Sequence, residues 1–230
     1  MLSAGLPIEK IVIAKSICLY RIDLDVFDDG VLFDTCYAAM PMQRKLKIDR
    51  MRFSAGKRQS LGAGVLLYAA LCEHGLRPED LTFAENTYGK TEIPSMKNVF
   101  RFNLSHTDGV AICAVHYSPD GHAREIGCDV ETVSASKSGI AERFFAREET
   151  DVLCGMSSEK EKTDLFFRLW TLKESFVKAV GLGFSLPFDR FAVLIEPDGS
   201  VGIRQNVVEG TCSFWDRREG NCHYAVCMME

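Results

Sequence analysis

The sequence lacks any apolar run long enough to cross a membrane. Its 230 residues are 47% hydrophobic and 26% charged, as in ordinary soluble globular proteins. Its longest apolar pieces, such as residues 65–71, are far shorter than the ~20 residues of a membrane-spanning helix. The start, Met1-Leu-Ser-Ala-Gly5, has no basic stretch followed by an apolar one. We therefore expect neither a membrane association nor a secretory signal.

Paired cysteines are also lacking. The nine cysteines are an odd number, scattered without a Cys-x-x-Cys pair, and the five histidines show no metal-ligand spacing. This pattern argues against a disulfide framework and against a zinc site. Because free thiols persist in reducing compartments, we expect the protein in the cytoplasm.

The chain has no excess of positive charge. Its net charge of −5 gives no general reason to expect nucleic acid as a partner. Basic residues nevertheless cluster between residues 44 and 58, where a single acidic residue, Asp49, accompanies Arg44, Lys45, Lys47, Arg50, Arg52, Lys57 and Arg58. Such a cluster suits a local anion site, although a solvated helix face is the commoner explanation of a charged run.

Two short stretches carry residue types suited to metal and phosphate chemistry. The pattern of residues 126–131 predicts a buried strand, on which Asp129 and Glu131 point to the same side. Residues 169–178 predict a helix with Glu174 and Lys178 on one face. Placed side by side, they supply three carboxylates, which suit a hard cation such as Mg²⁺, and one ammonium. Each pair taken alone is more often a solvated face or a surface ion pair.

The combination of these stretches, followed by the stop Gly181-Leu-Gly183, resembles the 4'-phosphopantetheinyl transferase superfamily. The two signatures of that family are a Gly-x-Asp-x-Glu strand and a Trp-x-x-Lys-Glu-(Ala/Ser)-x-x-Lys helix. The resemblance extends from about residue 44 to residue 193 and includes four further segments: Tyr88-Gly-Lys-Thr-Glu-Ile-Pro94, Phe102-Asn-Leu-Ser-His106, Arg143-Phe-Phe-Ala-Arg-Glu-Glu149 and Ser185-Leu-Pro187. Thr91 stands where the family commonly has proline, which we expect to loosen a turn, while Lys90 is retained.

Helix and strand patterns follow a similar order in the two halves of the chain. They predict a strand over 11–24, helices over 57–74, 140–154 (broken near 146–147) and 160–180, and a hairpin of 100–106 with 110–116. The resemblance implies an α+β fold of two similar subdomains related by a pseudo-twofold, each a small, mostly antiparallel sheet with a long packed helix. We place an N-terminal subdomain at 1–121 and a C-terminal one at 122–230, with the active site between them.

The resemblance also implies a reaction. Family members move the 4'-phosphopantetheine arm of coenzyme A onto a serine of an apo acyl or peptidyl carrier protein and release adenosine 3',5'-bisphosphate. By resemblance, Asp129, Glu131 and Glu174 hold Mg²⁺, for which Mn²⁺ is a possible substitute. Lys178 contacts the phosphate, and Glu174, directly or through a water, is the first choice for the base that takes the serine proton. The length of the chain favours a monomer over the short, trimeric type.

Further residues are candidates for contacts with coenzyme A. The resemblance places Ser105 and His106 at its phosphates, whereas a lone histidine at a strand end is otherwise more often structural. Candidates for the 3'-phosphate and adenine end are Arg44, Lys47, Lys57, Arg58 and Lys90. The role of Glu149, which matches an acidic position of the family, is left open. Aromatic residues at helical spacing are more often core than ligand contacts, so we assign to the core Phe144, Phe145, Phe166, Phe167 and Trp170.

Two alternative functions belong to other classes. A non-catalytic protein that binds coenzyme A or carrier domains needs the anion-binding residues but not the three carboxylates together with Lys178. A metal-dependent hydrolase of nucleotide pyrophosphates could use the same carboxylates on water. A requirement for the carrier serine distinguishes this hydrolase from the transferase.

Overall fold

The computed structural model describes residues 5–134 and 141–230, except for the side chains of residues 141, 142 and 184. Its internal contacts divide the chain into two compact units. The first unit comprises Met1–Ala84 and Thr91–Ala123, and the second comprises Glu85–Lys90 and Arg124–Glu230. The segment 85–90 thus belongs to the second unit although it lies within the first half of the sequence. The sequence-based division after residue 121 places the segment 85–90 in the N-terminal subdomain instead.

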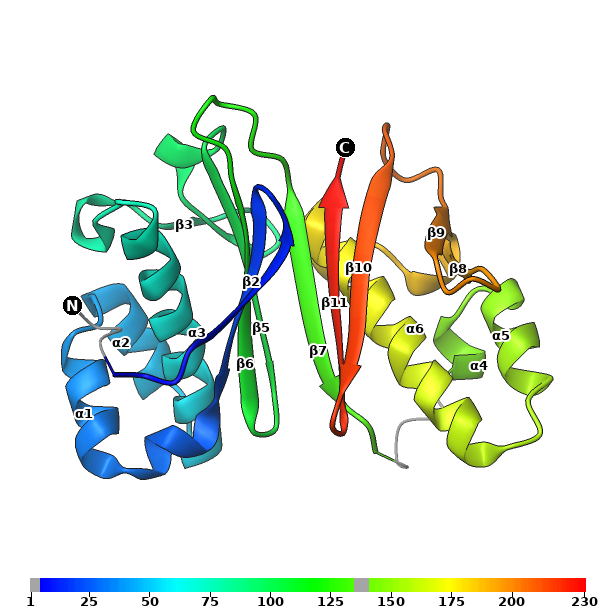
Figure 1. The fold of residues 1–230 in the computed structure, drawn as a ribbon, viewed down its shortest axis with the longest axis horizontal. Coiled ribbons are helices and arrows are strands. Elements are labelled where there is room, and N and C mark those ends of the chain that lie inside the picture. The colour runs from blue at the N-terminus through cyan, green and yellow to red at the C-terminus, as the bar shows by residue number, and fades with distance from the viewer. Residues whose placement is uncertain (1–4, 135–140) are drawn as a thin grey trace. The chain divides into compact units, whose positions relative to one another are not determined.

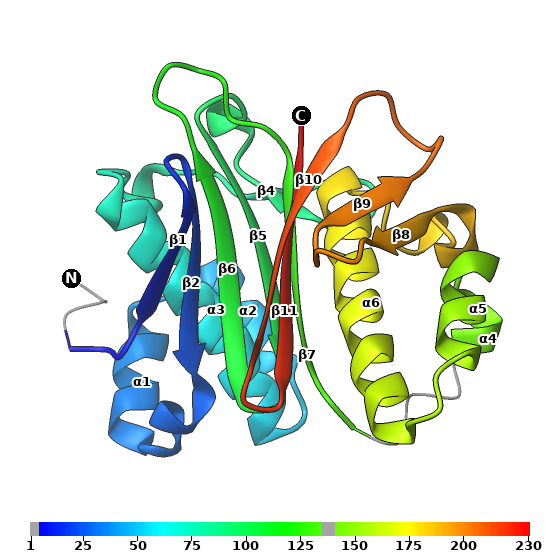
Figure 2. The same cartoon turned by 45° about the vertical axis from the view of Figure 1, so that its right-hand side comes forward.

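The first unit is built on a four-stranded antiparallel sheet, drawn in blue and green in Figure 1. Its strand order is β1-β2-β6-β5, which can be followed in Figure 2. Its strands are β1 (Glu9–Ala14), β2 (Ile17–Asp23), β5 (Phe100–Thr107) and β6 (Val110–Tyr117). The predicted hairpin is confirmed as β5 and β6. The single strand expected over 11–24 is wrong, because the polar pair Lys15-Ser16 turns the chain and makes a hairpin of β1 and β2.

One long helix covers this sheet. Helix α3 (Ser54–Glu73) packs mainly on β6, and α1 (Gly30–Ala38) and α2 (Met42–Asp49) pack against α3. Helix α3 confirms the helix expected over 57–74 and begins three residues earlier. The remaining elements are the two-residue strands β3 (Ala84–Glu85) and β4 (Thr91–Glu92) and the 3₁₀ turns Leu24–Asp28, Pro78–Asp80 and Pro94–Met96.

The second unit has a three-stranded antiparallel sheet with the order β10-β11-β7. Its strands are β7 (Ile126–Thr132), β10 (Cys212–Glu219) and β11 (Cys222–Met229). Helix α6 (Glu159–Val180) lies along β7 and β11, and a layer of shorter elements covers its other side (Figure 2). That layer contains α4 (Ala141–Phe144), α5 (Arg147–Cys154), β8 (Ala192–Ile195) and β9 (Val201–Arg204), and 3₁₀ turns follow at Gly183–Ser185 and Phe188–Arg190.

Local signals set the ends of the helices in the second unit. The Ser158 side chain accepts a hydrogen bond from the Glu161 N–H at the start of α6, and Gly181 ends the helix with φ of 78°. The break expected near 146–147 is confirmed, since α4 ends at Phe144 and α5 begins at Arg147. Residue 140, the expected start of this helical stretch, lies outside the described residues.

The predicted α+β class is confirmed, because both units combine helices with antiparallel sheets. Each unit also packs one long helix between its sheet and a layer of shorter elements. Among the described residues, no helix combines the length and apolarity that crossing a membrane requires.

Candidate active site

Strand β7 turns its two carboxylates toward helix α6. A Cβ added at Gly127 would lie 2.1 Å from the carbonyl oxygen of Ser175 and 2.2 Å from the backbone nitrogen of Ala179, so Gly127 faces α6 at backbone contact. Because side chains alternate along a strand, Asp129 and Glu131 share this face. Gly127 therefore allows the carboxylates to lie unusually close to the helix.

Lys178 of helix α6 forms an ion pair with Asp129. The Lys178 ammonium donates to Oδ1 of Asp129 at 2.6 Å, and the Asp129 side chain is only 6% exposed. Glu174 lies one helical turn before Lys178 and is partly buried. The structure thus brings together Asp129, Glu174 and Lys178 from two separate stretches, as the family resemblance implied.

The proximity of these charges changes their proton affinities. Burial, followed by the Asp129 carboxylate, raises the pKa of Glu174 to about 7, against the opposing effect of Lys178. Glu131 contributes to the same increase, so both carboxylates of β7 interact with Glu174. Burial alone would lower the pKa of Lys178, but Asp129 and Glu174 outweigh it, and the pKa of this ammonium is raised. Lys178 is therefore a cation at neutral pH, next to the carboxylates of Asp129 and Glu174.

The donor set fits a hard divalent cation. Within the described residues, no three His, Cys, Asp or Glu side chains are arranged closely enough, as they stand, to hold a metal ion. Instead, the Lys178 ammonium supplies the positive charge next to Asp129. Burial is the main cause of the raised pKa of Glu174, and the nearby carboxylates of Asp129 and Glu131 add to it. Carboxylate oxygens gathered in this way are the ligands that Mg²⁺ prefers. The residues present are thus chemically suited to such an ion.

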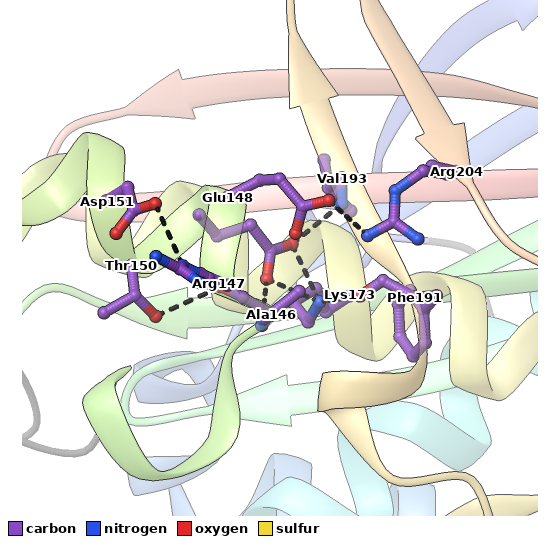
Figure 3. A network of polar contacts seen from close by, with 10 residues as sticks. Ala146, Arg147, Glu148, Thr150, Asp151, Lys173, Phe191, Val193 and Arg204 are labelled. Atoms are coloured by element: carbon purple, nitrogen blue, oxygen red, sulfur yellow. Dashed lines mark hydrogen bonds and ion pairs between the residues drawn. The ribbon is translucent and has the colours of Figure 1, made fainter.

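A buried ion pair is formed by Lys173, the residue that directly precedes Glu174 on α6 (Figure 3). The Lys173 ammonium donates to both oxygens of Glu149 at 2.7 Å and to the Phe191 carbonyl at 2.7 Å, and both charged side chains are at most 1% exposed. The backbone N–H groups of Ala146 (2.9 Å) and Val193 (2.7 Å) donate to the same carboxylate. This network ties α5 and β8 to the residue that directly precedes Glu174.

The polar partners satisfy these charges, and aromatic rings surround Lys173. Its ammonium lies 4.1 Å from the centroid of Phe191 and within 6 Å of the rings of Phe145 and Phe188. Burial lowers the pKa of Lys173 to about 8, with Glu149 opposing the decrease. The open question of Glu149 is thereby answered in structural terms, since its carboxylate is the counter-ion of Lys173.

A cavity of about 490 Å³ opens beside Glu174 and Lys178. Its walls are mostly apolar, and they are formed by Phe144, Trp170, Val177, Leu186, Pro187 and Phe188, with Arg143, Gly183 and Asp189. The core assignment is right for Phe145, Phe166 and Phe167, which are buried. It is wrong for Phe144, which is 43% exposed at the edge of this cavity, and Trp170 is only half-buried. A sequence shows that a side chain is apolar, but not whether its surroundings are closed.

The anion-binding candidates of the first unit lie around the start of α3 and the end of β5. Ser105 is buried and His106 is exposed on β5. The Gln59 amide donates to the Thr107 carbonyl at 3.3 Å, so the start of α3, which carries Lys57 and Arg58, contacts the end of β5. Arg58 also donates to Asp28 at 2.5 Å.

Two further basic residues of this unit are on α2. Lys47 lies 3.5 Å from the hydroxyl of Thr91, the position at which the sequence departs from the family pattern that it resembles. The Arg44 side chain lies over α3, where a Cβ on Gly64 would be 3.2 Å from its Nε. Lys90 belongs to the second unit, where its ammonium is bound by protein groups.

Comparison with known proteins gives a family model that covers both signature stretches. The model of the 4'-phosphopantetheinyl transferase superfamily matches residues 125–227. A 4'-phosphopantetheinyl transferase of Bacillus subtilis is 34% identical over 171 residues, which are 74% of this chain and 73% of the relative. The 4'-phosphopantetheinyl transferase Sfp of B. subtilis strain 168 is 34% identical over 162 residues, which are 70% and 69% of the two chains. The crystal structure of a holo-(acyl-carrier-protein) synthase from Bacillus anthracis, in complex with CoA (3',5'-ADP), has a TM-score of 0.42 at 20% identity and covers 46% of this chain and 95% of its own.

Proposed function

The chain belongs to the 4'-phosphopantetheinyl transferase superfamily, and from this we propose that it transfers the 4'-phosphopantetheine arm of coenzyme A to a serine of an apo acyl or peptidyl carrier protein. Adenosine 3',5'-bisphosphate is the second product. The observation that carries the proposal is the 2.6 Å contact of Lys178 with Asp129, with Glu174 one turn away, because it joins the two signature stretches in one cluster. The cluster is suited to phosphoryl transfer, in which a cation offsets the charge that develops on the pyrophosphate.

Three carboxylates hold the metal ion in this proposal. The carboxylates of Asp129 and Glu131 both disfavour the charged form of Glu174, and a divalent cation bound by the three side chains would relieve this effect. Mg²⁺ is the expected ion and Mn²⁺ a possible substitute. When bound, the ion neutralises the pyrophosphate and orients it for attack.

Lys178 and Glu174 do the remaining chemistry at this cluster. Lys178 keeps its proton, because its pKa is raised, and exchanges Asp129 for a phosphate oxygen of coenzyme A. Its positive charge stabilises the departing bisphosphate. Glu174 is the candidate base for the proton of the carrier serine, directly or through a water.

Coenzyme A is also bound through its phosphates in this proposal. The family resemblance assigns Ser105 and His106 to these phosphates, and both lie near the end of β5, which contacts the first turns of α3. Arg44, Lys47, Lys57 and Arg58 are candidates for the 3'-phosphate, and an anion near the start of α3 also gains from the helix dipole. We further propose that the protein acts as a monomer in the cytoplasm, where coenzyme A and carrier proteins meet.

Intact-mass spectrometry of an apo carrier protein tests the reaction. The carrier is incubated with this protein, coenzyme A and Mg²⁺, beside a reaction with EDTA and one with the carrier serine changed to alanine. We expect the mass of one phosphopantetheine to be added, and neither control reaction to show it. No addition on fatty-acid, polyketide or peptide carriers, with coenzyme A still bound, contradicts transfer. Release of bisphosphate without a carrier would instead indicate a hydrolase.

A further inference from the structure

Lys90 lies in a short loop that closes over the end of helix α6. Within this loop, which spans residues 86–90, Asn86 N–H donates to the Lys90 carbonyl at 2.9 Å. The Asn86 side-chain oxygen accepts from the backbone N–H groups of Tyr88 (2.9 Å) and Lys90 (3.0 Å). Gly89 allows the turn with φ of 85°. The 86–90 loop is therefore braced by its own hydrogen bonds.

The loop binds the last turn of α6 at two carbonyl groups. The Asn86 amide donates to the Gly181 carbonyl at 3.1 Å, and the Lys90 ammonium donates to the Ala179 carbonyl at 3.2 Å. Carbonyl groups at a helix end have no partner within the helix, and a cation there also interacts favourably with the helix dipole. The 86–90 loop is thus a C-terminal cap for the helix that carries Glu174 and Lys178.

The same ammonium also holds the beginning of β7. Lys90 Nζ donates to the Ile126 carbonyl at 3.2 Å and to Oε2 of Glu125 at 2.9 Å, and the Lys90 side chain is only 9% exposed. An ammonium has three N–H donors, and these three contacts can use all of them. A phosphate could bind Lys90 only by breaking one of these bonds.

The acceptors of Lys90 lie next to the groups of the candidate active site. Ala179 directly follows Lys178, and Ile126 directly precedes Gly127, where strand and helix touch at backbone contact. A shift of β7 along α6 would change the 2.6 Å contact of Lys178 with Asp129. Lys90 fixes the two elements at the one end where the 86–90 loop reaches both.

From this geometry we infer that Lys90 is a positioning residue, which fixes β7 against α6 and so sets the places of Asp129 and Lys178. The inference rests on the proposed transfer reaction and replaces the sequence-based expectation that Lys90 contacts coenzyme A. A positioning role predicts a loss in turnover without a loss in nucleotide affinity. A phosphate ligand predicts the opposite.

The test compares Lys90→Met with Lys97→Met. Lys97 is the matched control, since its ammonium is paired with Glu92 at 3.1 Å but is 49% exposed and far in sequence from both signatures. We measure kcat with coenzyme A and carrier protein, and the Kd of adenosine 3',5'-bisphosphate by calorimetry, well below the thermal midpoint of each variant. For Lys90→Met we expect kcat to fall about tenfold or more, since small displacements of reacting groups have effects of this size, while Kd stays within about twofold. Lys90→Arg, which can donate to the same carbonyls, should recover part of kcat.

Other outcomes overturn the inference. A Kd that rises about tenfold with kcat unchanged would make Lys90 a phosphate ligand. A lower thermal midpoint with both constants unchanged would leave it a purely structural cap. If the wild-type protein transfers nothing, the proposed function fails first, and amide hydrogen exchange then decides on Lys90. Lys90→Met should increase exchange in β7 and in the last turn of α6, and unchanged protection there contradicts the clamp.

Discussion

The two units share a strand order but join helix to sheet in different ways. When the edge strand β1 is left out, the order β2-β6-β5 in the first unit places the earliest strand beside the latest, followed by the strand before the latest, and β7-β11-β10 repeats this order in the second unit. Helix α3 meets its sheet with small and apolar residues, and its charges lie at its two ends. Helix α6 instead buries Lys173 in its middle and presents Glu174 and Lys178 toward the β7 side. The interface between helix and sheet is therefore apolar in the first unit and charged in the second. We call the contact of α3 with β6 the apolar joint and the contact of α6 with β7 the charged joint.

One glycine in each joint, Gly62 in the first unit and Gly127 in the second, shows the same difference between the two units. Gly62 of α3 approaches side chains, since an added Cβ would lie 2.4 Å from a Leu24 methyl group and 3.4 Å from the Ala111 Cβ. Gly127 of β7 approaches the backbone of α6. A side chain can rotate away from a new methyl group, but a helix backbone cannot. We therefore expect an added methyl group to be tolerated less well at Gly127 in the charged joint than at Gly62 in the apolar joint.

The largest difference in stability should come from the buried lysine. Lys173→Met leaves the Glu149 carboxylate without its counter-ion in a site that is at most 1% exposed, which should cost about 3–5 kcal/mol. The control in the first unit is Lys10→Met, which breaks the partly exposed pair of Lys10 with Glu73 and should cost at most about 1 kcal/mol. Urea unfolding of both variants measures the comparison.

A double variant separates the charge from the packing. Glu149→Gln combined with Lys173→Met removes both charges and should recover part of the lost stability, because no unpaired ion remains. A loss below about 1 kcal/mol for Lys173→Met alone would show that the backbone donors of Ala146 and Val193 are enough to hold the carboxylate.

The second prediction concerns activity rather than stability. Glu174→Ala or Asp129→Ala should reduce transfer by about a thousandfold or more while the protein stays folded, because each removes a carboxylate of the proposed metal site. The control in the first unit is Glu73→Ala. This change removes a carboxylate of helix α3 that accepts a hydrogen bond from the Tyr20 hydroxyl of strand β2 at 3.1 Å. That variant should keep nearly full transfer. Mass spectrometry of the carrier measures all three, and activity retained in either second-unit variant refutes the metal assignment.

The third prediction uses the two glycines. Gly127→Ala should cost about 3 kcal/mol, near the upper end of overpacking effects, because its methyl group meets backbone atoms at 2.1 and 2.2 Å. Gly62→Ala should be nearly neutral, since the gain of about 1 kcal/mol in helix propensity offsets the displacement of Leu24. Thermal unfolding in parallel measures the difference, and equal losses would show that the two joints are equally adaptable.

The sequence predicts which residues of the charged joint share a face only where the repeat of a single strand or helix determines it. The alternation of a strand places Asp129 and Glu131 on one face, and helical spacing does the same for Glu174 and Lys178. The contact between these stretches came from the family pattern. The pairing of Glu149 with Lys173 joins residues 24 positions apart, and the contact of Lys90 with Ala179 joins residues 89 apart. No periodicity reports such pairs, because tertiary packing creates them.

The smallest expected effect is a pH dependence of the apolar joint. Burial, aided by the Lys10 ammonium and opposed by Glu73, lowers the pKa of His74, whose ring stacks on Tyr117 with centroids 4.1 Å apart. The unfolded chain therefore takes up this proton at higher pH than the folded chain does. As pH falls through the ordinary histidine pKa of about 6.5, His74 protonation stabilises the unfolded state, and stability decreases.

His74→Phe should remove this decrease, so that the stability of the variant relative to wild type grows as the pH is lowered from 7 to 5. Among the described residues no group bonds the buried Nε2 of His74, so phenylalanine forfeits no hydrogen bond at this atom. The second unit gives the contrast, because burial also lowers the pKa of His223, but its Nε2 contacts Asp164 at 3.0 Å. His223→Phe should therefore cost stability already at neutral pH, since it removes that bond. Urea unfolding at several pH values measures both variants. A His74→Phe curve parallel to that of the wild type would mean that His74 keeps its ordinary pKa in the folded protein.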